Sequence, residues 1–193
     1  MENHEKSGFA RARLPWLIVI AALIVYVLTL NRWVSLASLP VVASVADKEV
    51  VPPLNGPLHF LVNFPFRWLP AAWQAVGLNI FAAVCGALSL GLLARSVALL
   101  PHDRTREQRQ RQRGEFSLLS IPTAWAPPLF AALMCGLQLS FWEHASAATG
   151  EMLDLLLFAY IIRCLLEYRI DQRETWLTRS ALVYGIGDRK SVV

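Results

Sequence analysis

Residues 140–154 place four side chains that can do chemistry at the start of an apolar run. Glu143 and His144 are followed by Glu151 and Asp154, and an uninterrupted apolar run comes next. On an α-helix, Glu151 and Asp154 are three residues apart and therefore project to one face. A charge at bilayer depth costs roughly 2.5–3.5 kcal/mol on insertion scales, so these two carboxylates are expected to face a protein interior or a watery cavity. They are candidate catalytic residues for that reason.

A simpler interpretation exists for the first of the two carboxylates. Glu151 can complement the positive end of a helix that Thr149 or Ser146 caps. A helix over 150–168 would be about 28 Å long, just enough to span a bilayer, which leaves Glu151 near the outer interface. Asp154 would lie one turn deeper. Capping and a polar cavity both remain open for Glu151, and Asp154 carries more of the functional inference.

The residues just before these carboxylates are candidate substrate contacts. Trp142 closes an apolar run at its outer face, and Glu143 and His144 follow it in a short turn. The two polar residues are either solvated or part of one acidic pocket with Glu151 and Asp154. In such a pocket His144 can exchange a proton or bind a phosphate as imidazolium.

The first outer segment of the chain contributes four more candidate residues. Asp47 and Glu49 form its acidic pair, and they are either catalytic carboxylates or solvated loop charges. His59 lies among prolines and aromatics and is either an interfacial packing residue or a substrate contact. His59 and Arg67 are both suited to stabilise a leaving phosphate.

The composition is that of a membrane protein. Of 193 residues, 55% are hydrophobic and 17% are charged, and the mean hydropathy is +0.44. A spanning helix needs about 20 apolar residues, and the stretches that approach this length are 14–30, 68–94, 116–142 and the charge-interrupted 145–168. Residues 59–69, rich in aromatics, suit a helix in the outer interface. We predict an all-α, polytopic transmembrane helix bundle of about four spans plus this outer interfacial helix.

The basic residues predict the orientation of the chain. With a cytoplasmic N-terminus, most of them lie inside and only Arg32, Lys48 and Arg67 lie outside, as the positive-inside rule requires. The arginine-rich run 104–113 is then an anchor beside anionic lipid and not a nucleic-acid site. The first apolar run has no cleavage site after it, which indicates an uncleaved anchor. We expect a multi-pass protein of the inner (plasma) membrane, with membrane lipid and no nucleic acid as a partner.

The remaining sequence signals concern cysteines and domain limits. Cys85, Cys135 and Cys164 fall in different apolar segments without Cys-x-x-Cys spacing, which indicates packing residues and neither a disulfide nor a metal site. Residues 1–187 are predicted to be the N-terminal part of one multi-span membrane domain. Residues 188–193 are predicted to be a non-native tail, because one reading frame of a widely used sequencing adapter encodes these six residues. The chain would then be a fragment.

Several motifs in order resemble a known family. Residues 55–60 (Asn-Gly-Pro-Leu-His-Phe) precede the second span, an arginine-rich inner loop follows, and 140–142 (Ser-Phe-Trp) lie ahead of Glu151. Together they resemble a bacterial domain-of-unknown-function family related to protein O-mannosyltransferases, with the transmembrane protein 260-like group as its animal relative. The resemblance covers roughly residues 14–187.

The resemblance implies a GT-C glycosyltransferase that takes sugar from a polyprenyl-phosphate donor on the outer side, with no further cofactor. Family members carry Asp-Ser-Gly-Glu in the first outer loop, whereas residues 35–44 here contain no carboxylate. Asp47 or Glu49 can replace that acid only if the loop has shifted. Two alternatives therefore stay open: a noncatalytic scaffold of the same fold, and an ion-coupled transporter that uses Glu151 and Asp154.

Overall fold

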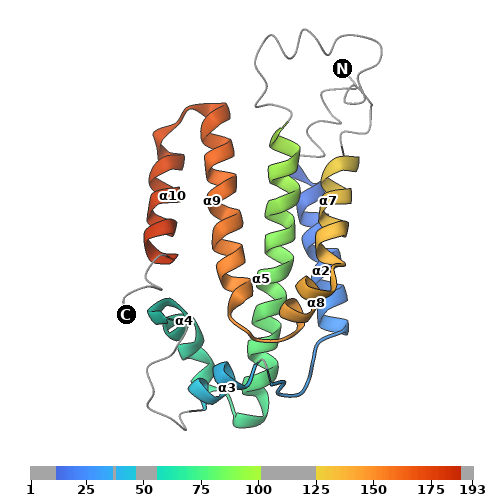
Figure 1. Ribbon diagram of the computed structural model, residues 1–193, viewed down its shortest axis with the longest axis vertical. Coiled ribbons are helices and arrows are strands. Elements are labelled where there is room, and N and C mark those ends of the chain that lie inside the picture. The colour runs from blue at the N-terminus through green and yellow to red at the C-terminus, as the bar shows by residue number, and fades with distance from the viewer. Residues whose placement is uncertain (1–11, 37, 47–55, 101–124, 188–193) are drawn as a thin grey trace.

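The computed structural model describes residues 12–36, 38–46, 56–100 and 125–187, and every regular element in these ranges is a helix (Figure 1). The prediction of an all-α fold is confirmed. The helices are α2 (Leu14–Leu28), α3 (Leu39–Val45), α4 (Gly56–Asn63), the 3-10 helix η1 (Phe64–Trp68), α5 (Ala71–Leu99), α7 (Ala126–Gly136), α8 (Leu139–Ser146), α9 (Glu151–Asp171) and α10 (Glu174–Gly187).

Helix α5 is the centre of the bundle. Helices α2, α7 and α8 pack against it on one flank and α9 on the other, and α10 packs against α9 (Figure 1). Glycines permit this close packing, since a Cβ atom added at Gly86 would lie 3.0 Å from Ala145 of α8. A Cβ added at Gly91 would collide with Val19 of α2. Small residues in α5 thus let the neighbouring helices approach closely.

Only part of the predicted span arrangement is visible in the helices. Among the described residues, α5 alone is long and apolar enough to cross a membrane, with 29 residues. Helices α2 and α7 are apolar but shorter, with 15 and 11 residues. The predicted span 116–142 is interrupted where α7 ends at Gly136 and α8 begins at Leu139. Helix α9 has 21 residues, and its charged side chains lie toward its two ends.

The short helices gather where α5 begins, and we call this the α3–α4 end of the bundle (Figure 1). Val41 and Val45 of α3 pack on Leu78 of α5 and on Ala148. The predicted interfacial helix over 59–69 is two elements, α4 and η1, because proline 65 has no N–H to continue an α-helical ladder. We call the other end, where α9 turns into α10, the α9–α10 end.

Candidate functional site

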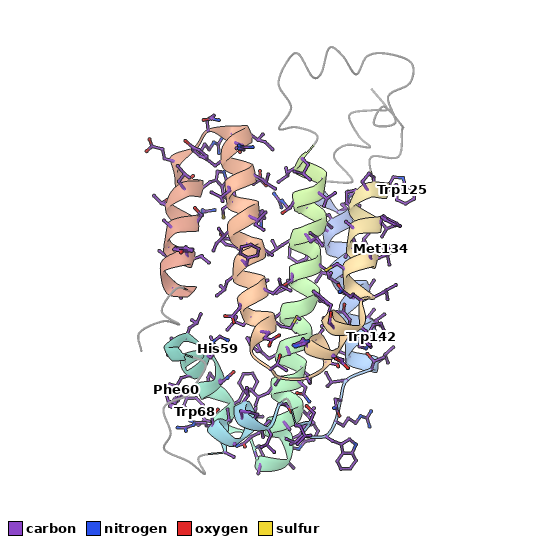
Figure 2. The ribbon with its side chains drawn as sticks, in the orientation of Figure 1. His59, Phe60, Trp68, Trp125, Met134 and Trp142 are labelled. Atoms are coloured by element: carbon purple, nitrogen blue, oxygen red, sulfur yellow. The ribbon has the colours of Figure 1, made fainter. Side chains whose placement is uncertain are left out.

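His59 of α4 lies against the first turn of α9 (Figure 2). Its Nε2 atom is 3.1 Å from the carbonyl oxygen of Gly150 and 3.6 Å from Oδ1 of Asp154. The first distance is a hydrogen bond, whereas the second is an ion-pair distance. The side chain of His59 is 5% exposed and that of Asp154 is 32% exposed. The buried His59 thus contacts Asp154, a carboxylate that is exposed enough for a ligand to reach.

The backbone at Gly150 decides where α9 begins. Gly150 is the N-cap residue, and its φ of 86° is in the left-handed region that favours glycine. Its carbonyl accepts hydrogen bonds from Leu153 N–H at 3.2 Å and from His59. The predicted capping by Thr149 or Ser146 is wrong, because α9 has no side-chain cap. Capping by either side chain therefore does not explain the site.

The two hydroxyls that were expected to cap α9 have other environments. Ser146 donates a hydrogen bond to the carbonyl oxygen of Glu143 at 3.1 Å. The Thr149 hydroxyl is buried and has no hydrogen-bond partner in the described ranges. A buried, unpaired hydroxyl costs free energy.

A second histidine–carboxylate pair lies one turn earlier on α9. His144 Nε2 is 2.8 Å from Oε2 of Glu151, and His144 Nδ1 is 2.6 Å from the carbonyl oxygen of Ser140. Both ring nitrogens face oxygen acceptors, so both contacts are hydrogen bonds together when the ring carries two protons. Glu151 is the more open partner, with 67% of its side chain exposed. The structure therefore brings both predicted carboxylates of α9 to predicted histidines.

Asn79 supports the site and was missed by the sequence reasoning. This α5 side chain is 1% exposed. Its Nδ2 donates to the carbonyl oxygen of Asn31 at 2.7 Å, and its Oδ1 accepts from Ala148 N–H at 2.9 Å. It thus ties the chain after α2 and the α8–α9 connection to α5. The available signal was a single asparagine within an apolar span, since a polar residue there is expensive without partners.

The predicted phosphate contact Arg67 is part of the packing of η1. Its Nη2 donates to the carbonyl oxygen of Ser44, at the end of α3, over 3.1 Å. Its Cζ atom lies 5.4 Å and 6.0 Å from the ring centroids of Phe60 and Phe64. These distances indicate cation–π contacts. Arg67 therefore joins η1 to α3 close to His59.

Other predicted site residues do not join the His59–Asp154 pair. Trp142 lies on the opposite flank of α5 (Figure 2), edge-on to Tyr26 with 5.8 Å between ring centroids. It lines an apolar cavity of about 140 Å³ between α2 and α7. Glu143 is exposed on α8. Asp47 and Glu49 lie outside the described residues, so their predicted roles stay predictions.

Ser35 and Ser38 bond to each other in the segment where the resemblance implies an acid. Ser38 is 1% exposed, and Oγ of Ser35 and Oγ of Ser38 are 3.1 Å apart. Ser38 Oγ also accepts from Ser35 N–H at 2.9 Å. This local bonding satisfies the segment internally and supplies no carboxylate.

A small cavity lies beside His59. Its volume is about 20 Å³, enough for about one water molecule. Asn63, Phe81 and Leu153 are among its lining residues. Within the described ranges, no group of three or more histidine, cysteine or acidic side chains is placed to hold a metal ion. The chemistry that the site can perform with its own groups is proton transfer at Asp154, with His59 as its partner.

The described residues form an all-helical bundle whose central helix is long and apolar enough to cross a membrane. Two histidine–carboxylate pairs lie at one end of this bundle. Residues 41–188 match the family described as protein O-mannosyl-transferase TMEM260 N-terminal domain. The chain belongs to this family, which confirms the predicted relation to protein O-mannosyltransferases. No curated protein and no solved structure matches the chain.

Proposed function

We propose that this chain is the membrane-embedded part of a GT-C glycosyltransferase that moves a sugar from a polyprenyl-phosphate donor to an acceptor hydroxyl at the outer membrane face. The observation that carries the proposal is the contact between buried His59 and the accessible Asp154, 3.6 Å apart. This contact joins the first outer segment to the start of α9. Membership of the O-mannosyl-transferase family supports the choice of reaction.

Exposed apolar side chains support embedding of several helices in a bilayer. Large patches of this kind mark membrane or protein interaction surfaces. They include Trp16, Ile20 and Ile24 of α2 and Phe130, Leu133 and Met134 of α7. With the arginine-rich run 104–113 on the cytoplasmic side, the α3–α4 end faces outward.

The reaction needs a base for the acceptor. The acceptor oxygen attacks the anomeric carbon of the sugar, the bond from that carbon to the donor phosphate breaks, and the phosphate keeps the electron pair. The acceptor proton passes to Asp154, whose side chain is 32% exposed. His59 holds this carboxylate in place, and Arg67 is the proposed partner of the phosphate. A positioned base contributes about 10²–10⁴-fold to such a rate.

The test uses the full chain purified in lipid nanodiscs with radiolabelled polyprenyl-phosphate mannose and a serine- and threonine-containing acceptor peptide. We expect Asp154→Asn to lower transfer at least about 100-fold while donor binding is kept. Asp171→Asn is the matched control, because it makes the same substitution in an exposed carboxylate at the far end of α9. The proposal fails if the unaltered chain neither binds nor consumes the donor, or if Asp154→Asn transfers at the unaltered rate.

One observation favours a second candidate, a noncatalytic scaffold that binds the donor. Residues 35–44 carry no carboxylate where relatives have an acid, and Ser35 and Ser38 bond to each other there. Donor binding without any transfer in the same nanodisc experiment would support this scaffold. The transporter alternative gains no support, since Glu151 and Asp154 lie in the first turn of α9 and transporter sites lie near the bilayer midplane.

A further inference from the structure

A separate group of charged side chains lies near the α9–α10 end of the bundle. Glu167 of α9 is 2% exposed, and its Oε1 accepts hydrogen bonds from Nη2 and Nε of Arg95 at 2.8 and 3.2 Å. The Nε atom of Arg163 lies 4.0 Å from the same oxygen. Helices α5 and α9 are thus joined by two guanidinium groups around one buried carboxylate.

Helix α10 adds a third guanidinium group to this region. The Cζ atoms of Arg163 and Arg179 lie 6.0 and 5.1 Å from the ring centroid of Trp176. We call Arg95, Arg163, Glu167, Trp176 and Arg179 the arginine cluster. It brings together side chains from α5, α9 and α10.

The described side chains of the arginine cluster carry an excess of positive charge. Its charged groups are three arginines, which stay protonated in proteins, and one carboxylate: Arg95 and Arg163 lie beside Glu167, and Arg179 lies over Trp176. Moreover, Nε of Arg163 is buried and has no hydrogen-bond partner in the part of the chain that the structure describes. A buried donor on a charged group is costly without an acceptor. The excess of positive charge points to an anionic partner on the exposed side of the cluster, where Arg179 lies.

We propose that the arginine cluster binds the phosphate of an anionic lipid headgroup. Guanidinium groups match phosphate oxygens through paired N–H donors, and they are common at phosphate sites for that reason. Arg179 is exposed and Trp176 is half-buried, so a headgroup can reach both side chains from outside. Trp176 also suits the headgroup level, where tryptophan is enriched.

The surface around the cluster favours a lipid over free phosphate as the source of that group. Ile162 and Leu165 of α9 lie one residue before and two residues after Arg163 and are 38% and 45% exposed, and Leu182 of α10 is 64% exposed. This apolar surface suits acyl chains and would be unused by inorganic phosphate.

The proposed lipid site is independent of sugar transfer. Glu167 lies thirteen residues after Asp154 on the same helix, which is about 20 Å at 1.5 Å per residue. A lipid at the arginine cluster therefore does not touch the His59–Asp154 pair, and loss of one activity does not entail loss of the other.

The test measures lipid binding to the full chain in detergent by native mass spectrometry and by the shift in melting temperature. The probes are phosphatidylglycerol, phosphatidylcholine with the same acyl chains, and inorganic phosphate. We expect phosphatidylglycerol to bind at least fivefold more tightly than phosphatidylcholine. The double variant Arg163→Gln with Arg179→Gln should lose at least fivefold of this affinity.

The matched control is Arg173→Gln, which removes one positive charge from an exposed residue at the same end of the bundle. Its affinity for phosphatidylglycerol should stay within twofold of the unaltered chain. If the double variant does not fold, Arg179→Gln alone tests the proposal, since this side chain is exposed. Equal binding of the two lipids, equal protection by inorganic phosphate, or an equal loss in Arg173→Gln would overturn the proposal.

Discussion

Asn79 Oδ1 accepts a 2.9 Å hydrogen bond from the backbone N–H of Ala148, so one side chain of the long apolar helix holds the connection between α8 and α9. Ala148 is two residues before Gly150, whose carbonyl oxygen accepts from His59. The Nδ2 atom of Asn79 donates a second hydrogen bond, to the carbonyl oxygen of Asn31, at 2.7 Å. The position of the candidate site therefore depends on α5 as well as on α4 and α9.

Replacing Asn79 should destabilise the bundle. Asn79→Ala leaves the Ala148 N–H and the Asn31 carbonyl without their partner in a buried place, so we expect a loss of about 1–3 kcal/mol. Thermal unfolding in detergent, followed by circular dichroism, measures it. Gln74→Ala is the matched control, because Gln74 is also a buried amide of α5 but its hydrogen bond among the described residues is to the nearby Leu69 carbonyl. Equal losses in the two variants would contradict the supporting role of Asn79.

Removing the Thr149 hydroxyl should cost nothing. Thr149→Val deletes a buried hydroxyl that has no hydrogen-bond partner in the described ranges, so the melting temperature should stay the same or rise. A true helix cap would lose about 1 kcal/mol instead. Ser146→Ala serves for comparison, because its hydroxyl donates to Glu143 and should lose about 0.5–1.5 kcal/mol. A lower melting temperature in Thr149→Val would restore the capping interpretation.

The helices were predictable where the sequence contains a long apolar stretch. The run that gave the second span became α5, from Ala71 to Leu99, and the start predicted at Gly150 agrees with α9. The break between α7 and α8 at Leu137 was not predicted, because single polar residues such as Gln138 and Ser140 do not by themselves end an apolar span. A change of helix direction there depends on packing against α5, which hydropathy does not encode.

The candidate site was predictable in its residue types and not in its pairing. His59, His144, Glu151 and Asp154 stood out because charged or titratable groups are rare in this sequence. Which histidine meets which carboxylate depends on how α4 docks against α9, a contact between residues 91 positions apart. No local pattern specifies such a contact. The left-handed backbone at Gly150 was likewise invisible, since glycine is compatible with many conformations.

A side chain at Gly150 should disturb both the helix start and the site. Gly150→Ala places a Cβ atom at a φ of 86°, which costs roughly 1–2 kcal/mol. It also moves the carbonyl oxygen that accepts from His59, so sugar transfer should fall as well. Gly185→Ala is the control, because a Cβ there meets nothing within 4 Å and should leave stability equal or higher. Melting temperatures that rank the two variants in the opposite order would contradict the strained N-cap.

Removing only the carboxylate of the Arg95–Glu167 ion pair should destabilise the protein more than replacing both partners with apolar side chains. Glu167→Gln leaves the Arg95 and Arg163 guanidinium groups without their carboxylate, and we expect a loss of about 3 kcal/mol, because the Arg95 side chain is 31% exposed and partly solvated. Arg95→Met combined with Glu167→Leu should recover part of that loss, since apolar side chains of similar volume avoid the cost of desolvating these two charges, although Arg163 still lacks its carboxylate. A double-mutant cycle of unfolding midpoints in detergent separates the two cases. Glu174→Gln, an exposed carboxylate at the same end, should change stability by less than about 0.5 kcal/mol. If Glu167→Gln is as neutral as this control, the pair does not hold α5 to α9.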